Sequence, residues 1–101
     1  MLANFRCYQI AKEVFADCEK LPLKGEIKSQ LNRAALSIVL NLAEGSGKFE
    51  KNEQKRFFKI AFGSIREVQA ILDLIKNDEI LVKVDRLAAT TWCLIRAGAV
   101  S

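Results

Sequence analysis

Four polar residues recur at helical spacing inside an otherwise apolar stretch of the chain. Arg33, Ser37, Asn41 and Glu44 are separated by steps of 4, 4 and 3 residues, which places them on one face of a helix. Serine and asparagine are mediocre helix formers, and a solvated helix face more often carries lysine and glutamate. The residue types and their spacing therefore predict hydrogen bonds and ion pairs with a specific partner surface.

Two interpretations of this polar stripe are open at the level of sequence. In the structural one, which we favour, the stripe meets Arg56, Ser64 and Glu67 of the next helix in a buried network that fixes the register of the two helices. An antiparallel pairing then puts Glu44 nearest Arg56 and Arg33 nearest Glu67. In the functional one, the stripe lines a groove that binds a ligand or a partner chain.

A second chemical feature is the positive charge that follows the stripe. In a bundle, the start of the first helix, the connection between the second and third helices and the end of the fourth helix share one pole. We expect that pole to carry an excess of four positive charges, equal to the net charge of the whole chain. Its cations are Arg6, Lys48, Lys51, Lys55, Arg56, Lys59 and Arg96.

Lysine concentrated at a helix N-terminus favours an anionic partner, through its charge and through the exposed N–H groups there. Nucleic-acid phosphate is the natural candidate, with Lys48, Lys51, Lys55, Arg56 and Lys59 as the binding residues. The alternative is an ordinary solvated surface, because a net charge of +4 is modest.

Composition restricts the other chemistry that the chain can perform. The sequence contains no histidine, which removes the commonest general base near neutral pH and excludes Ser-His-Asp and Cys-His arrangements within one chain. The cysteines Cys7, Cys18 and Cys93 form no CxxC pair, and we interpret them as small core residues rather than metal ligands. A Ser-Lys dyad or a carboxylate pair is compatible with the composition, but no spacing points to either. We expect no enzyme activity, no metal and no cofactor.

The segment Gly45-Ser46-Gly47-Lys48 resembles a phosphate-binding loop only superficially. The Walker pattern requires a glycine five residues before Gly47, where Leu42 stands, and it follows a strand rather than a helix. We expect a helix C-terminus at Gly45 and a flexible turn after it.

Apolar periodicity predicts four helices, over residues 5–20, 26–44, 51–76 and 84–96, with no strand signal. Asn4 is a candidate N-cap of the first helix. The stripe of the second helix includes Ile27, and that of the third begins at Phe57, with Phe58 broadening it. Short connections make this an all-α, antiparallel up-down-up-down four-helix bundle.

Two further features follow from the same pattern. Gly63 lies in the middle of the third helix, where glycine costs about 1 kcal/mol relative to alanine. We expect a close helix crossing there. The whole chain, residues 1–101, is predicted to form one domain in the cytoplasm, because it has no signal-peptide-like start and no apolar run of the roughly 18 residues that span a membrane.

Three segments carry a family resemblance: LNRAALSI at residues 31–38, NLAEG at 41–45 and RFFKIAFGSIRE at 56–67. They resemble the four-helix bundle proteins known as 23S rRNA intervening-sequence proteins, with looser agreement in the first and fourth helices. The family's recurrent polar positions map onto Arg33, Ser37, Asn41, Glu44, Arg56, Ser64 and Glu67.

The resemblance implies a bacterial protein of uncertain biochemical role that assembles into a homopentameric ring. A related branch, the accessory variability determinant of diversity-generating retroelements, binds nucleic acid and a reverse transcriptase. Two departures stand out. Val39 occupies the place of a proline that is common in the family, and the chain ends soon after the fourth helix, without the basic tail of some relatives.

Together these observations predict a non-enzymatic, homo-oligomeric binding module that binds structured RNA or DNA through the basic pole, and the family resemblance implies that the oligomer is a pentamer. The alternative is a protein-interaction scaffold that touches no nucleic acid and recruits a partner protein, such as a reverse transcriptase. Neither hypothesis involves a membrane.

Overall fold

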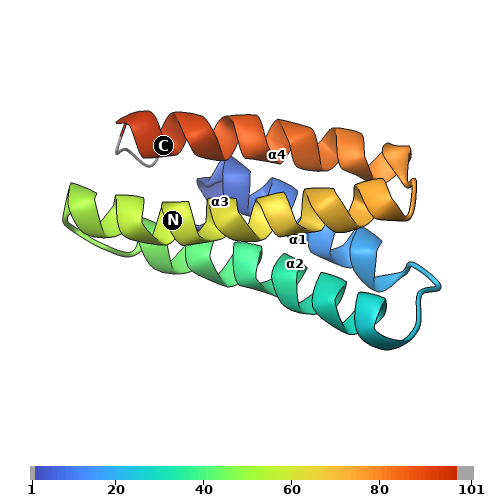
Figure 1. Cartoon of the computed structure of the whole chain (residues 1–101). Helices are drawn as coiled ribbons and strands as arrows, with labels where there is room; N and C mark the ends of the chain where they lie inside the picture. The colour runs from blue at the N-terminus through green and yellow to red at the C-terminus, as the bar shows by residue number, and fades with distance from the viewer. Residues whose placement is uncertain (1, 98–101) are drawn as a thin grey trace.

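The computed structural model describes residues 2–97, and within them the chain is almost entirely helical. A short 3-10 turn, η1 (Leu2–Asn4), precedes four α-helices: α1 (Arg6–Glu19), α2 (Gly25–Ser46), α3 (Lys51–Leu74) and α4 (Asp78–Ala97). Successive helices run in opposite directions and pack side by side in a molecule that measures 40 × 22 × 21 Å (Figure 1). The all-α four-helix bundle that the sequence predicts is confirmed.

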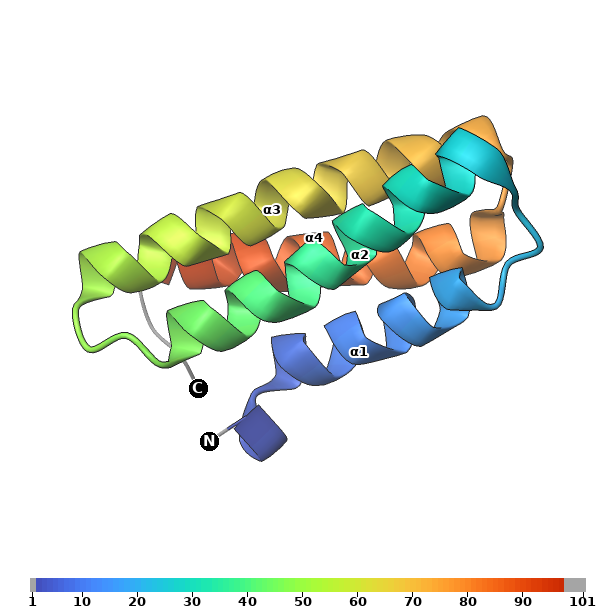
Figure 2. The same cartoon turned by 90° about the horizontal axis from the view of Figure 1, so that it is seen from below.

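Side-chain contacts between neighbouring helices show the antiparallel order directly. Ser37 and Arg33 of α2 contact Ser64 and Glu67 of α3, so residue numbers fall along one helix as they rise along the other. In the same way, Cys7 and Asp17 of α1 contact Thr91 and Lys83 of α4, so the first and last helices are also antiparallel neighbours. The connections α1–α2 and α3–α4 lie at one end of the bundle, and the α2–α3 connection lies at the other (Figure 2).

The core is a continuous apolar cluster contributed by all four helices. Its largest fully buried side chains include Leu31, Ile38, Phe58, Ile65 and Leu72. Thr91 is the one buried polar residue among those described, and its hydroxyl donates a long hydrogen bond to the Cys7 sulfur at 3.9 Å. Burial of this kind is the main stabilising term for helices that are individually marginal in water.

The start of α1 differs from the prediction. Asn4 belongs to the 3-10 turn, and Phe5, with an extended backbone, occupies the N-cap position without a side-chain cap. Phe5 is only 1% exposed, and its ring lies 6.1 Å from that of Phe58. The helix start is therefore set by burial of an aromatic side chain and not by capping from Asn4.

The end of α2 also differs. The helix continues through Gly45 to Ser46 and is capped at Gly47, whose φ of −89° needs no glycine. Gly45 is buried, because the ring of Phe58 occupies the space where a Cβ would lie. The sequence Gly-Ser-Gly indicates a loop, but tertiary packing keeps its first residue in the helix.

The α3–α4 connection is shorter than predicted. Lys76 adopts φ 58°, and the Asn77 N–H donates to the Leu72 carbonyl at 2.9 Å, which closes α3 with a Schellman motif. The Asn77 side chain accepts a hydrogen bond from the Ile80 N–H at 3.0 Å and so caps α4. The fourth helix consequently begins at Asp78 rather than at residue 84, and α3 ends two residues earlier than predicted.

Two core assignments are wrong. Phe58 is fully buried whereas Phe57 is only partly buried, so the aromatic that leads the third helix into the core is the second of the pair. Ile27 is 45% exposed, because it lies in the first turn of α2 near the end of the bundle.

Candidate nucleic-acid interface and polar seam

The five predicted phosphate-binding residues gather around the α2–α3 connection. Lys48 lies in the connection itself, and Lys51, Lys55 and Lys59 follow at four-residue intervals along the first turns of α3. Arg56 lies beside this lysine stripe with a side chain that is 61% exposed. We call these residues, Lys48, Lys51, Lys55, Arg56 and Lys59, the basic cluster.

Two members of the basic cluster are held by local contacts. The ammonium of Lys48 lies 3.8 Å from the Glu44 carboxylate and 5.2 Å from the centre of the Phe57 ring. The guanidinium of Arg56 lies 3.5 Å from Glu53 and 4.7 Å from the same ring. The Phe57 ring therefore contacts one cation from the connection and one from α3, which fixes where those charges point.

The other three members have no ion-pair partner among the residues described. Within residues 2–97, no carboxylate lies within 4.0 Å of Lys51, Lys55 or Lys59. Glu50 occupies the N-cap position of α3 without a side-chain cap hydrogen bond, so the N–H groups of the first turn are left for water or an external acceptor. Positive side chains and a positive helix end thus coincide.

The polar stripe of α2 forms a seam with α3. The hydroxyl groups of Ser37 and Ser64 share a hydrogen bond of 2.7 Å. The Asn41 amide donates to the Ser37 carbonyl at 2.9 Å and to its hydroxyl at 3.1 Å. At the far end of the seam, Arg33 forms an ion pair with Glu67, as the antiparallel pairing predicts.

The predicted buried network between the polar stripe and α3 is wrong in two respects. It is not buried, since the Arg33 and Glu67 side chains are 59% and 38% exposed and the two serines are half-buried. The predicted pairing of Glu44 with Arg56 does not form. Residue 57 of α3, not residue 56, turns toward α2, so Arg56 points about 100° away and pairs within its own helix.

Gly63 does not mark a close crossing, contrary to the expectation from sequence. It is exposed, and nothing lies within 4 Å of the position that a Cβ would take. The close approach between α2 and α3 occurs at Gly45, where a Cβ would lie 2.6 Å from the Phe58 ring and 3.1 Å from the Phe57 Cβ.

Exposed apolar residues beside the seam were missed by the sequence reasoning. Leu36 and Leu40 of α2 are 44% and 55% exposed, and Ile60 of α3 is 43% exposed. The Ser37–Ser64 contact places Leu40 level with Ile60 across the helix pair. The signal was present, because Leu36 and Leu40 fall outside the core stripe defined by Leu31, Ile38 and Leu42. Leucines that lie outside the core-facing stripe of a helix indicate a second apolar contact surface.

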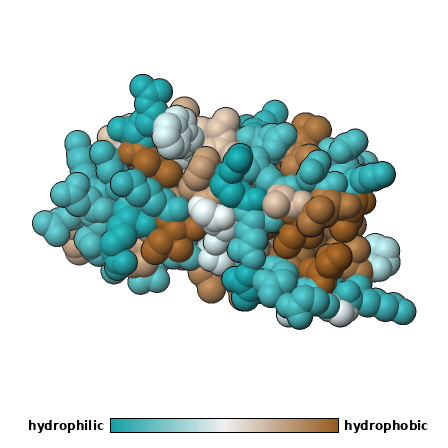
Figure 3. All heavy atoms as spheres, in the orientation of Figure 1, coloured by the Kyte–Doolittle hydropathy of each residue, from teal (hydrophilic) through white to brown (hydrophobic). Residues whose placement is uncertain are grey.

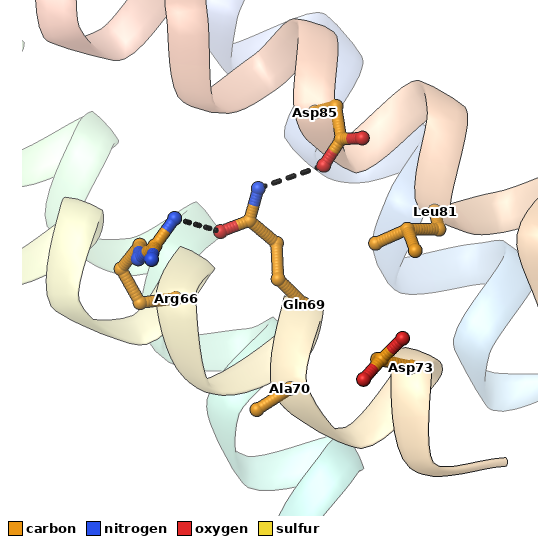
Figure 4. A pocket seen from close by; sticks show the side chains of 6 residues that line it. All are labelled: Arg66, Gln69, Ala70, Asp73, Leu81 and Asp85. Atoms are coloured by element: carbon orange, nitrogen blue, oxygen red, sulfur yellow. Dashed lines mark hydrogen bonds between the residues drawn. The ribbon is translucent and has the colours of Figure 1, made fainter. Parts of the chain in front are cut away.

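An open groove of about 310 Å³ lies between α3 and α4 (Figure 4). Arg66 donates to Gln69 at 3.0 Å, and Gln69 donates to Asp85 at 2.8 Å, so a hydrogen-bonded chain crosses from one helix to the other. Asp73 and Leu81 complete this side of the groove. Its polar groups are largely engaged with one another and stabilise the α3–α4 contact.

The cysteines are only partly as predicted. Cys7 and Cys18 are buried, whereas Cys93 is exposed on α4. Burial raises the pKa of the Cys18 thiol to about 11, and the neighbouring Asp17 carboxylate adds to the rise. Across residues 2–97 we find no group of three or more acidic, cysteine or histidine side chains that could hold a metal ion. Within the same range, no helix is long and apolar enough to cross a membrane.

The chain matches a family model described as 23S rRNA-intervening sequence protein over residues 4–90. The match spans α1, α2, α3 and most of α4, including the polar seam and the basic cluster. The family resemblance carried by the three motif segments is thereby confirmed. No curated protein matches the chain.

Proposed function

The chain belongs to the 23S rRNA-intervening sequence protein family, and from this premise we propose that it is a non-enzymatic, homo-oligomeric module of the bacterial cytoplasm that binds structured RNA or DNA. The basic cluster is the proposed contact surface. The family description refers to an intervening sequence of 23S rRNA and assigns no activity, so the support for binding comes from the surface of the protein.

The observation that carries the proposal is the stripe of Lys51, Lys55 and Lys59 next to the uncapped N-terminus of α3. No carboxylate in residues 2–97 compensates these three charges at contact distance. Lysines at four-residue spacing lie about 6 Å apart along a helix, a spacing close to that of successive phosphates on a nucleic-acid strand. The surface of this end is mainly hydrophilic (Figure 3).

Self-association is supported by the apolar residues beside the polar seam. Leu36, Leu40 and Ile60 leave a partly exposed apolar strip on the α2–α3 pair, which is the kind of surface that an identical chain covers in a homo-oligomer. The resemblance implies five copies. A ring of copies would present the basic cluster repeatedly, and repeated weak phosphate contacts give strong overall binding.

The second candidate function is a scaffold that recruits a partner protein, such as a reverse transcriptase, without touching nucleic acid. The same exposed leucines favour it, because an apolar strip can receive a foreign helix as well as an identical one. The two functions differ in their response to salt, since apolar contacts survive salt that weakens phosphate contacts.

Charge reversal tests the proposal with a matched control. The variant Lys48→Glu/Lys51→Glu/Lys55→Glu reverses three of the five charges of the basic cluster. The variant Lys20→Glu/Lys24→Glu/Lys76→Glu makes the same change of net charge at the opposite pole. In fluorescence anisotropy with a labelled RNA stem–loop and a DNA duplex, we expect the first variant to lose roughly a hundredfold or more in affinity. The control should stay within about threefold of the wild type, because distant charges are screened. Equal losses in both variants would contradict a localised site.

A further inference from the structure

Phe49, at the tip of the α2–α3 connection, is the most exposed large apolar side chain among the residues described. Phe49 is fully exposed, whereas the next such residue, Leu74, is 75% exposed. Large aromatic side chains are usually buried, because removing their apolar surface from water stabilises the fold. Stabilisation of the fold therefore does not explain why the Phe49 ring lies wholly in water at the centre of a basic surface.

The backbone around Phe49 is held on both sides. The Lys48 N–H donates to the Gly45 carbonyl at 3.1 Å, and the Gln54 side chain donates to the Lys48 carbonyl at 3.0 Å. On the other side, the Gln54 N–H donates to the Glu50 carbonyl at 3.0 Å. The connection is short and hydrogen-bonded, so it presents the ring outward in advance of binding, which lowers the entropy lost on contact.

The two aromatic rings of this region have different roles. The Phe57 ring makes cation–π contacts with Lys48 and Arg56. The Phe49 ring makes no aromatic pair and no cation–π contact within residues 2–97. One ring thus orients the charges, and the other keeps its face available to a ligand.

We propose that Phe49 stacks on an unpaired nucleobase, so that the ligand of the basic cluster contains single-stranded nucleotides such as a loop, a bulge or an overhang. This inference rests on the proposed function and narrows its substrate class. Cationic side chains that follow the backbone, combined with an aromatic face, are the elements with which proteins hold single strands. The bases of an intact duplex are stacked on each other and offer no face to a side chain.

The charge around Phe49 favours a nucleobase over an apolar pocket of a protein partner. Lys48 and Lys51 lie within two residues of it, against one carboxylate, Glu50, and Lys55 follows one turn later. Burying these ammonium groups against an apolar protein surface would cost their hydration, whereas a nucleic-acid strand provides phosphates at the same place as the base.

The test compares a labelled RNA stem–loop with the same stem as a blunt-ended duplex, each titrated with wild-type protein and with Phe49→Ala. We expect the wild type to prefer the stem–loop, and Phe49→Ala to weaken stem–loop binding by roughly ten- to a hundredfold while leaving duplex binding unchanged. Phe49→Trp should retain stem–loop binding, and Leu74→Ala, which removes an exposed side chain remote from the basic cluster, should have no effect.

A spectroscopic readout reports the stacking itself. In a Trp92→Phe background, Phe49→Trp is the only tryptophan of the chain, and its fluorescence should be quenched by the stem–loop and not by the duplex. Sedimentation velocity should give the same oligomeric state for Phe49→Ala as for the wild type. A change of oligomeric state would show that a second copy covers the ring and would overturn the inference.

The outcomes separate this inference from the proposed function. If Phe49→Ala binds both RNAs like the wild type while the triple lysine variant binds neither, the stacking role is wrong and the phosphate surface stands. If the wild type binds neither these RNAs nor the DNA duplex, both proposals fail.

Discussion

The backbone of Gly45 lies directly against the ring of Phe58. A Cβ at position 45 would stand 2.6 Å from Cε1 and 2.9 Å from Cδ1 of that ring, closer than real Cβ atoms approach other groups. Phe58 is fully buried and cannot move without disturbing the core at the basic pole. This contact sets the depth at which the last turn of α2 packs on the first turns of α3, and hence the position of the connection that carries Lys48.

Substitution at the two helical glycines should therefore have opposite effects on stability. Gly45→Ala is expected to lower the free energy of unfolding by about 1–3 kcal/mol, because the added methyl group overpacks a core position. Gly63→Ala meets no atom within 4 Å and should raise it by about 0.5–1 kcal/mol through helix propensity. Urea denaturation followed by circular dichroism measures both. A neutral Gly45→Ala would show that the Phe58 ring adjusts freely.

Lys28 provides a second test of the fold. Its ammonium donates to the carbonyls of Cys18, Glu19 and Leu21 at 3.3, 2.7 and 2.8 Å, and so closes the C-terminal end of α1. Lys28→Met keeps the aliphatic stem but leaves these acceptors without the charge, and should destabilise by about 1–3 kcal/mol. Lys24→Met, an exposed neighbour, should change stability by less than about 0.5 kcal/mol. Similar values for both variants would rule out a capping role.

The buried thiol of Cys18 predicts a stability change at alkaline pH. Its pKa in the folded protein is raised from an ordinary 9.0 to about 11, mainly by burial, so the unfolded chain releases this proton first. The contribution is fully present below pH 9 and is lost as the pH rises toward 11, by roughly 3 kcal/mol. Urea titrations between these pH values should show the loss for the wild type. The loss should be smaller for Cys18→Ala, and an identical pH profile in the two proteins would contradict this assignment.

The exposed leucines beside the seam should control assembly. Leu40→Glu places a charge in the middle of the partly exposed strip formed with Leu36 and Ile60, and should shift the protein toward monomer. Val82→Glu, on α4, alters a side chain that is 71% exposed and should leave the assembly intact. Native mass spectrometry or sedimentation velocity distinguishes the two. A wild type that is monomeric at high concentration would refute self-association.

Helical periodicity was sufficient to predict the bundle, because long amphipathic segments joined by short connections have few other ways to bury their apolar faces. It could not choose between Phe57 and Phe58, which are adjacent and differ by about 100° around the helix. Only the packing of α2 against α3 decides which of them enters the core. The same packing keeps Gly45 helical, although its sequence context indicates a turn.

The candidate site was predictable to the extent that it is local. Lys48, Lys51 and Lys55 gather because a short connection brings them together whatever the tertiary structure. The partner of Glu44 was not predictable, since Lys48, four residues further along the chain in the α2–α3 connection, competes with Arg56 of α3. Phe49 was not predictable, because it lies in a connection outside the helical periodicity and only the folded structure shows its complete exposure.

The most direct test of the central claim is the salt dependence of nucleic-acid binding by the wild-type protein. Fluorescence anisotropy of a labelled RNA stem–loop, titrated at low and at physiological salt, gives the number of phosphates that the surface neutralises. If the five cations of the basic cluster each contact one phosphate, affinity should fall by about 100- to 500-fold between 50 and 200 mM salt, the lower value for single-stranded and the higher for duplex contacts. Absence of binding at low salt, or binding that does not respond to salt, would contradict a phosphate surface and leave the scaffold function in its place.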